Sequence, residues 1–139
     1  MRRERTIAAL TFALVAAAAS IGCRADPSTA RGTAERFLDA HYVEIDLPAA
    51  LPYTSGVARH KVEQEMELVK GVPIDDTTHK PIVRYSLAEE RPDADGGTKF
   101  LYHGRILVEG GEGFDRRWLV TVRREGDGYR VTNYQELSE

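Results

Sequence analysis

Two aspartates and a set of aromatic and imidazole side chains could together perform proton-transfer chemistry. A proton-abstracting site needs a carboxylate base, poised by a cavity of low dielectric, and a Tyr or protonated acid that stabilises the developing oxyanion. Asp39 and Asp46 are the candidate bases. Their candidate partners are Tyr42, Tyr85, Tyr102 and His103. The commoner roles of such aspartates are a solvated helix face for Asp39 and a helix cap for Asp46, so we assign no catalytic residue.

The four histidines show no spacing that predicts a metal site. They are His41, His60, His79 and His103, and they include neither an HxH nor an HExxH pair, the spacings that bring two imidazoles to one metal ion. His41 with Glu44 is typical of a surface ion pair on a helix. His103 lies among aromatic and apolar residues, where a neutral imidazole could line a cavity, although a solvent-facing position is commoner. We predict no metal and no cofactor.

The first 22 residues predict an export signal. Met1 to Arg5 is a positively charged head, and Ile7 to Ala19 is an apolar run without a charge, which is the pattern of a secretory signal. The run is shorter than the roughly 20 residues that a membrane-spanning helix needs, so a permanent transmembrane helix is the lesser alternative. We therefore predict a signal peptide in residues 1–22, a tether in residues 23–29 and a single domain in residues 30–139.

Residues 20–23, with the sequence SIGC, resemble a bacterial lipobox. The resemblance implies that the chain is cut before Cys23, whose thiol and new amino group then carry acyl chains such as palmitate. Two or three such chains give stable membrane anchoring. Cys23 is the only cysteine in the chain, and it stands where this machinery uses a thiol. Ser20 departs from the usual Leu, and ordinary cleavage after residue 22 or 25 would instead leave a free periplasmic or secreted protein.

Helical periodicity precedes strand periodicity along the rest of the chain. Asp26 is expected to cap a helix that runs from Pro27 to Ile45, and a short helical turn follows from Leu47 to Tyr53. Ser55 could cap a third helix, which Gly71 stops. Four stretches with a period of two then predict strands, at Pro81–Leu87, Thr98–Glu109, Arg116–Arg124 and Tyr129–Leu137. This order predicts an α+β fold, with N-terminal helices packed on one face of an antiparallel sheet of about four strands.

Glycine, aromatic and basic residues mark particular points of the predicted sheet. Gly104 is expected at a bend or bulge. An aromatic set is typical of a core, and as cavity lining it would suit an apolar ligand with one or two polar handles; it comprises Tyr85, Tyr102, Trp118, Tyr129 and Tyr134. Four arginines flank one strand and suggest a strand protected from edge-to-edge association; they are Arg116, Arg117, Arg123 and Arg124.

Two stretches resemble the nuclear-transport-factor-2-like superfamily of cystatin-like folds. They are AERFLDAHY at residues 34–42, and RWLVTV at 117–122 with GYRV at 128–131. The resemblance covers residues 30–137 at the level of order and pattern, and implies a long helix across a curved sheet that leaves a cone with an open mouth. Relatives include ketosteroid isomerase, polyketide cyclases related to SnoaL, binding modules and small bacterial lipoproteins of unknown function. The fold alone therefore does not determine which of these activities the protein has.

Charge and cysteine content exclude several classes of protein. The net charge is −3, and loss of Arg2, Arg3, Arg5 and Glu4 with the signal makes it −5. Nucleic-acid binding is excluded because it depends on an excess of Lys and Arg that displaces counterions from phosphate. A single cysteine also excludes an internal disulfide framework.

These observations lead to one preferred function and two alternatives. We expect a lipid-anchored protein of the cell envelope, at the outer membrane facing the periplasm in a Gram-negative cell, that binds a small apolar ligand or an envelope protein without catalysis. The concave sheet face would form the binding surface, and the residues expected to line its cavity are Tyr42, Asp46, Tyr85, His103 and Trp118. The first alternative is an isomerase- or cyclase-type enzyme acting on a hydrophobic carbonyl compound. The second is a scaffold that forms a homodimer through its sheet.

Overall fold

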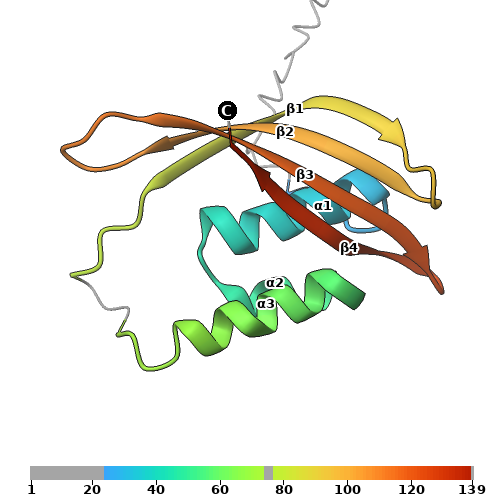
Figure 1. The fold of residues 1–139 in the computed structure, drawn as a ribbon, viewed down its shortest axis with the longest axis horizontal. Coiled ribbons are helices and arrows are strands. Elements are labelled where there is room, and N and C mark those ends of the chain that lie inside the picture. The colour runs from blue at the N-terminus through green and yellow to red at the C-terminus, as the bar shows by residue number, and fades with distance from the viewer. Residues whose placement is uncertain (1–23, 74–76, 139) are drawn as a thin grey trace, which may run out of the picture.

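Within the described part of the chain, three helices precede four strands, in the order that the sequence predicts. A computed structural model describes residues 24–73 and 77–138; Cys23 and the predicted export signal lie outside the described residues. The helical elements are α1 (Ala30–Leu38), the π-helical segment η1 (Asp39–Val43), α2 (Leu47–Ala50), the 3₁₀ segment η2 (Leu51–Tyr53) and α3 (Gly56–Leu68). The strands are β1 (Ile82–Pro92), β2 (Thr98–Leu107), β3 (Phe114–Glu125) and β4 (Gly128–Leu137). The helices all lie on one side of the sheet (Figure 1), which confirms the α+β prediction.

The strands form an antiparallel meander in the order β1-β2-β3-β4. Because β3 is an interior strand, the prediction that its arginines protect an exposed edge is wrong. Edge protection belongs to β1, which combines Pro92 at its end with a bulge between Leu87 and Glu89. Both features interrupt the row of backbone groups that another strand would pair with.

The first helix begins three residues later than predicted. Thr29 is the residue that caps α1, since its Oγ1 accepts a 2.9 Å hydrogen bond from the backbone N of Gly32. Asp26 instead caps the preceding turn by accepting a bond from the Ser28 backbone N at 2.9 Å. A side chain at residue 32 would collide with the backbone carbonyl of Asp26, so the glycine lets this turn pack on the helix. Residues 24–29, which were expected to form a tether, therefore lie against α1.

Alternate residues of the strands face the helices and form the core. The fully buried side chains include Phe37 and Leu38 from α1, Val62 from α3 and Phe100 from β2, and burial of each such side chain stabilises the fold by about 1.5–3 kcal/mol. Gly104 faces the same side. It is paired regularly with both neighbouring strands, so the bulge predicted there is wrong. A Cβ at residue 104 would overlap the indole of Trp118, and the glycine is therefore required by close packing.

Candidate functional site

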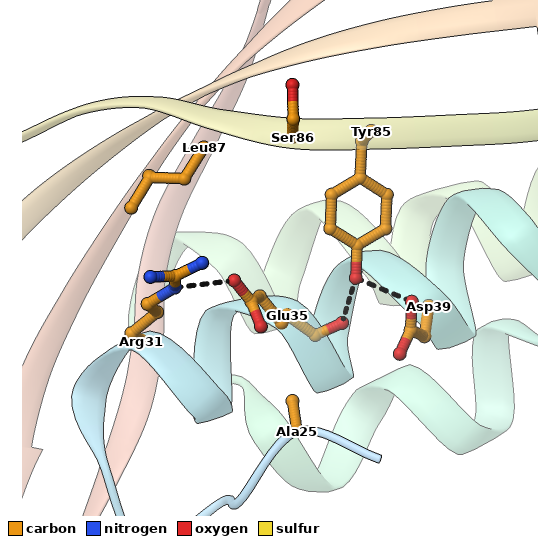
Figure 2. A pocket seen from close by; sticks show the side chains of 7 residues that line it. All are labelled: Ala25, Arg31, Glu35, Asp39, Tyr85, Ser86 and Leu87. Atoms are coloured by element: carbon orange, nitrogen blue, oxygen red, sulfur yellow. Dashed lines mark hydrogen bonds and ion pairs between the residues drawn. The ribbon is translucent and has the colours of Figure 1, made fainter. Parts of the chain in front are cut away.

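A groove between α1 and β1 brings together one predicted base and one predicted tyrosine (Figure 2). The volume of the groove is about 640 Å³, and its walls are Ala25, Arg31, Glu35, Asp39, Tyr85, Ser86 and Leu87. The hydroxyl of Tyr85 donates to Oδ1 of Asp39 at 2.6 Å and also lies 3.2 Å from the carbonyl oxygen of Glu35. The two side chains meet because Asp39 begins η1, directly after α1, while Tyr85 points from β1 toward the helices.

Electrostatics keep the Tyr85 proton in place. Burial raises the pKa of Tyr85, and the hydrogen bond to the Asp39 carboxylate raises it further, because both effects disfavour the phenolate. Beside this pair, the Nε of Arg31 lies 2.7 Å from Oε1 of Glu35. The groove is thus lined mainly by charged groups that already have partners, and a carbonyl ligand would have to displace Asp39 to receive the Tyr85 proton.

The other residues predicted to line a cavity lie in different places. Asp46 is exposed and caps α2, because its Oδ1 accepts a 3.1 Å hydrogen bond from the Ala49 backbone N. Tyr42 packs its ring 4.6 Å from that of Trp118, which is 1% exposed. His103 is exposed on the outer face of the sheet. The structure therefore does not bring the predicted set together around one cavity.

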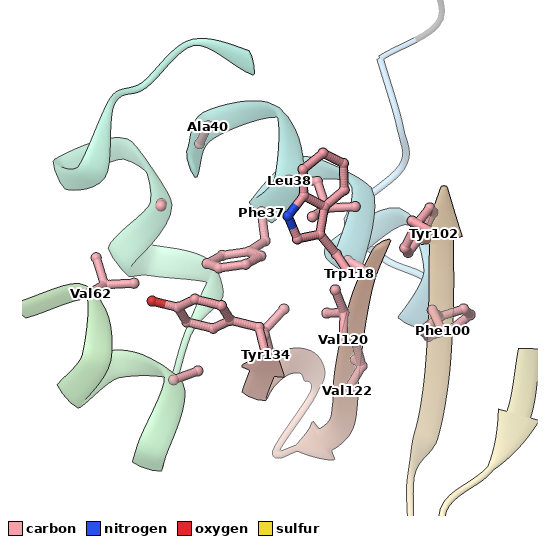
Figure 3. Close-up of a cluster of buried hydrophobic side chains, with 14 of the residues drawn as sticks. Phe37, Leu38, Ala40, Val62, Phe100, Tyr102, Trp118, Val120, Val122 and Tyr134 are labelled. Carbon is pink, nitrogen blue, oxygen red and sulfur yellow. The ribbon is translucent and has the colours of Figure 1, made fainter. Parts of the chain in front are cut away.

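The space between the helices and the sheet is filled with side chains (Figure 3). Phe37 from α1 lies 4.9 Å from the ring of Tyr134 on β4, and both are buried. Trp118, Val120 and Val122 follow one another along β3 on the same inner face. The concave face of the sheet, which was expected to be the binding surface, carries the hydrophobic core instead. The aromatic set predicted on the sheet belongs to this core or packs against it.

A polar cluster that the sequence did not predict links three elements around Glu65. One oxygen of the Glu65 carboxylate lies 2.6 Å from the Nε2 of His41, and the other accepts a 2.6 Å hydrogen bond from the Tyr134 hydroxyl. Burial acts to raise the pKa of Glu65, but the hydrogen bonds from His41 and Tyr134 and the charge of Lys61 outweigh it, so the pKa is lowered. The cluster connects η1, α3 and β4, and His41 pairs with Glu65 rather than with Glu44. Its members are too far apart in sequence for helical spacing to reveal them.

No described helix covers the outer face of the sheet, and most of the charged side chains on that face are basic. The register places these side chains there by alternation: the basic ones are Arg84, Arg91, Lys99, Arg105, Arg117, Arg123 and Arg130, and the acidic ones are Glu89, Asp115 and Glu125. Between them lie the half-buried leucines 101, 119 and 137. Some of these arginines stand out in the sequence, but only the strand register shows that they share one face.

The described residues hold neither a cluster of metal-binding side chains nor a membrane-spanning helix. In residues 24–73 and 77–138, no group of three or more His, Cys, Asp and Glu side chains is arranged to hold a metal ion. Over the same ranges, no helix has both the length and the apolar character that crossing a membrane requires.

Comparison with known proteins identifies the fold. No protein-family model and no curated protein sequence matches the chain. The solved structure of the Agrobacterium tumefaciens VirB8 protein is similar, with a TM-score of 0.55, 12% identity and coverage of 78% of this chain and 90% of that one. The intermembrane space region of the chloroplast protein ARC6 has a TM-score of 0.45, 11% identity and coverage of 84% and 100%, a likeness too weak to carry an argument. At such low identity the VirB8 likeness shows the fold alone, and that fold is nuclear-transport-factor-2-like, as predicted.

Proposed function

We propose that the protein is exported, is anchored in the cell envelope through acyl chains on Cys23, and binds an acidic protein partner through the outer face of its sheet without catalysis. The observation that carries the binding role is the excess of basic over acidic side chains on that face. Arg84 lies directly opposite Arg105, and Arg123 directly opposite Arg130, and like charges in such positions destabilise a sheet. Asp115 offsets the charge of Arg105, and Asp93 that of Arg123.

The carboxylates of an acidic partner would replace the repulsion between these arginines with attraction. Among the described residues, no carboxylate lies within ion-pair distance of Arg84 or Arg117. The carboxylates of a partner could pair with these two guanidinium groups, for which Arg is well suited by its fork of donors. The leucines between the arginines would then supply apolar contact at the centre of the interface.

The geometry gives less support to an isomerase or cyclase. A hydrophobic carbonyl compound needs a mostly apolar pocket with a few polar groups, whereas the groove beside Tyr85 is lined largely by Arg31, Glu35 and Asp39. Asp46 and Tyr42, the pair that the sequence offered for this chemistry, are a helix cap and a packed core side chain. A non-catalytic module therefore accounts better for the described residues.

The anchoring half of the proposal is tested by the intact mass of the protein extracted from membranes of its native host. We expect a chain that begins at Cys23 and carries acyl chains. An unmodified chain, whether full-length or cut elsewhere, would refute the anchor. Replacement of Cys23 by Ser should release the protein from the membrane fraction if the anchor exists.

The binding half is tested by placing a photo-crosslinking amino acid at Leu119 on the outer face. The matched control carries the same group at Gln64, an exposed position on α3. We expect an adduct with another protein only from position 119, and its loss in the double variant Arg84→Glu, Arg117→Glu. Raised salt should weaken the adduct, because screening acts on exposed charges. Equal adducts from both positions, or an adduct that survives the charge reversal, would contradict the assigned surface.

A further inference from the structure

A hollow in the outer face of the sheet lies where a short side chain stands among longer ones. Its volume is about 360 Å³. The register places Arg84 opposite Arg105 and Ser86 opposite His103, so these four outward side chains surround the hollow in two neighbouring rows. Figure 2 shows Ser86 pointing away from α1, toward this outer side. Because serine is the shortest of the four side chains, it leaves room above β1 and β2 for a small ligand.

The side chains around the hollow carry more positive than negative charge. In the described part of the chain, neither Arg84 nor Arg117, which faces the same side from β3, has an ion-pair partner. Arg105 pairs with Asp115 at 3.2 Å, and Asp115 is the only carboxylate among the described residues that line the hollow. Glu89, farther along β1, has its own arginine partner. Two guanidinium groups beside the hollow are therefore left without a counter-charge.

We infer that the hollow binds the phosphate group of a small phosphate monoester. The inference rests on the basic outer face of the proposed function, but it does not depend on the anchor. A phosphate monoester carries a charge of about −1.5 to −2 at pH 7, which matches the two unbalanced guanidinium groups. Its oxygens can accept hydrogen bonds from Arg84, from the hydroxyl of Ser86 and from the imidazole of His103. Arginine holds such an oxyanion through two parallel N–H groups.

A carboxylate would suit the hollow less well than a phosphate monoester. It carries a single charge, so one of the two unbalanced guanidinium groups would remain unpaired. Asp115 opposes any anion, but its ion pair with Arg105 directs its charge to that side chain and holds Arg105 beside the hollow. The site is therefore selective for a doubly charged oxyanion.

Binding is measured by isothermal titration calorimetry on the full chain as its native host processes it. The probes are glycerol 3-phosphate, dimethyl phosphate and acetate, because the second keeps the phosphate group but carries only one negative charge. We expect glycerol 3-phosphate to bind at least ~10-fold more tightly than either of the others, since it alone pairs with both guanidinium groups. Arg84→Gln should weaken its binding by about 10-fold or more, the usual effect of losing a hydrogen bond to a charged group.

Two further variants separate the hollow from the general charge of the protein. Ser86→Leu fills the hollow without a change in charge, so it should also weaken glycerol 3-phosphate binding by at least ~10-fold, with an unchanged circular dichroism spectrum. Arg59→Gln is the matched control for charge. Arg59 is exposed on α3, and its loss should change the affinity by less than ~2-fold, because distant surface charges contribute little.

The outcomes distinguish this site from the proposed protein partner. Equal affinities for glycerol 3-phosphate and dimethyl phosphate, or equal losses in Arg84→Gln and Arg59→Gln, would overturn the inference. Binding only to vesicles that contain phosphatidic acid would also overturn it, since the phosphate group would then belong to a membrane. Glycerol 3-phosphate binding without a crosslink from Leu119 would sustain the phosphate site and refute the protein partner. A crosslink that depends on Arg84, without glycerol 3-phosphate binding, would do the reverse.

Discussion

Replacement of Gly104 by Ala tests the close packing between β2 and the core most sharply. The added methyl group would overlap the benzo ring of Trp118, and the farthest of its three nearest ring atoms, Cε3, would lie only 3.1 Å away. Ordinary contacts of a Cβ begin at about 3.4 Å. The substitution adds only one carbon atom, but that atom would lie in space that the indole of Trp118 already fills.

The cost follows from the surroundings of the indole. Trp118 is 1% exposed and Tyr42 packs against its ring, so the indole must move by roughly 1 Å or more into space that is already close-packed. Overpacking of this kind costs about 3 kcal/mol, the upper end of the usual range. For a domain of this size, that lowers the thermal midpoint by more than about 10 °C.

The assay is urea and thermal unfolding followed by circular dichroism, with the emission of Trp118, the only tryptophan, as a second probe. Gly111→Ala is the matched control. It lies in a turn without a positive φ, and its nearest neighbour would be 3.7 Å away, so we expect a change within about 0.5 kcal/mol. The double variant Gly104→Ala, Trp118→Phe should show favourable coupling of about 1 kcal/mol or more, because phenylalanine lacks the ring atoms that the methyl group meets.

A Gly104→Ala protein as stable as the control would refute the packing argument. Additivity of the two changes in the double variant would also contradict it, since the loss at residue 104 would then not depend on the indole.

Three further substitutions test polar contacts. Glu65→Gln should lower the free energy of unfolding at neutral pH by about 1 kcal/mol, a modest cost because the carboxylate is about one-third exposed. Because the pKa of Glu65 is lowered, its carboxylate stabilises the folded state above pH 4.5, the ordinary pKa, and this contribution is lost as pH falls through the folded pKa. In urea titrations below that pH, the Gln variant should therefore lose stability less steeply than the parent protein. The same slope of stability against acid pH in both proteins would contradict the assignment. Asp46→Ala should cost about 1 kcal/mol through loss of the α2 cap, whereas Asp46→Asn should retain most of the stability, and equal losses in thermal unfolding would argue against a capping role. Tyr85→Phe should cost about 1 kcal/mol, because it removes the donor to Asp39; calorimetry that shows no loss would mean that the contact contributes nothing in solution.

Local patterns in the sequence predict the elements well because each pattern has a local cause. The period of two in Thr98–Leu107 and Phe114–Glu125 reflects side chains that alternate between the core and water. Helix ends are harder to place. Both Asp26 and Thr29 can cap a helix, and the choice between them depends on how the turn packs against Gly32.

The site residues were harder to predict because their contacts join distant parts of the chain. Asp39 and Tyr85 are 46 residues apart and meet only through the packing of β1 over α1. Glu65 has no sequence signal, since its partners His41 and Tyr134 lie on other elements. The arginines of the outer face have a signal in their number, but β3 was interpreted as an exposed strand. Only the sheet order shows that β3 is interior and that its outward arginines lie beside those of its neighbours.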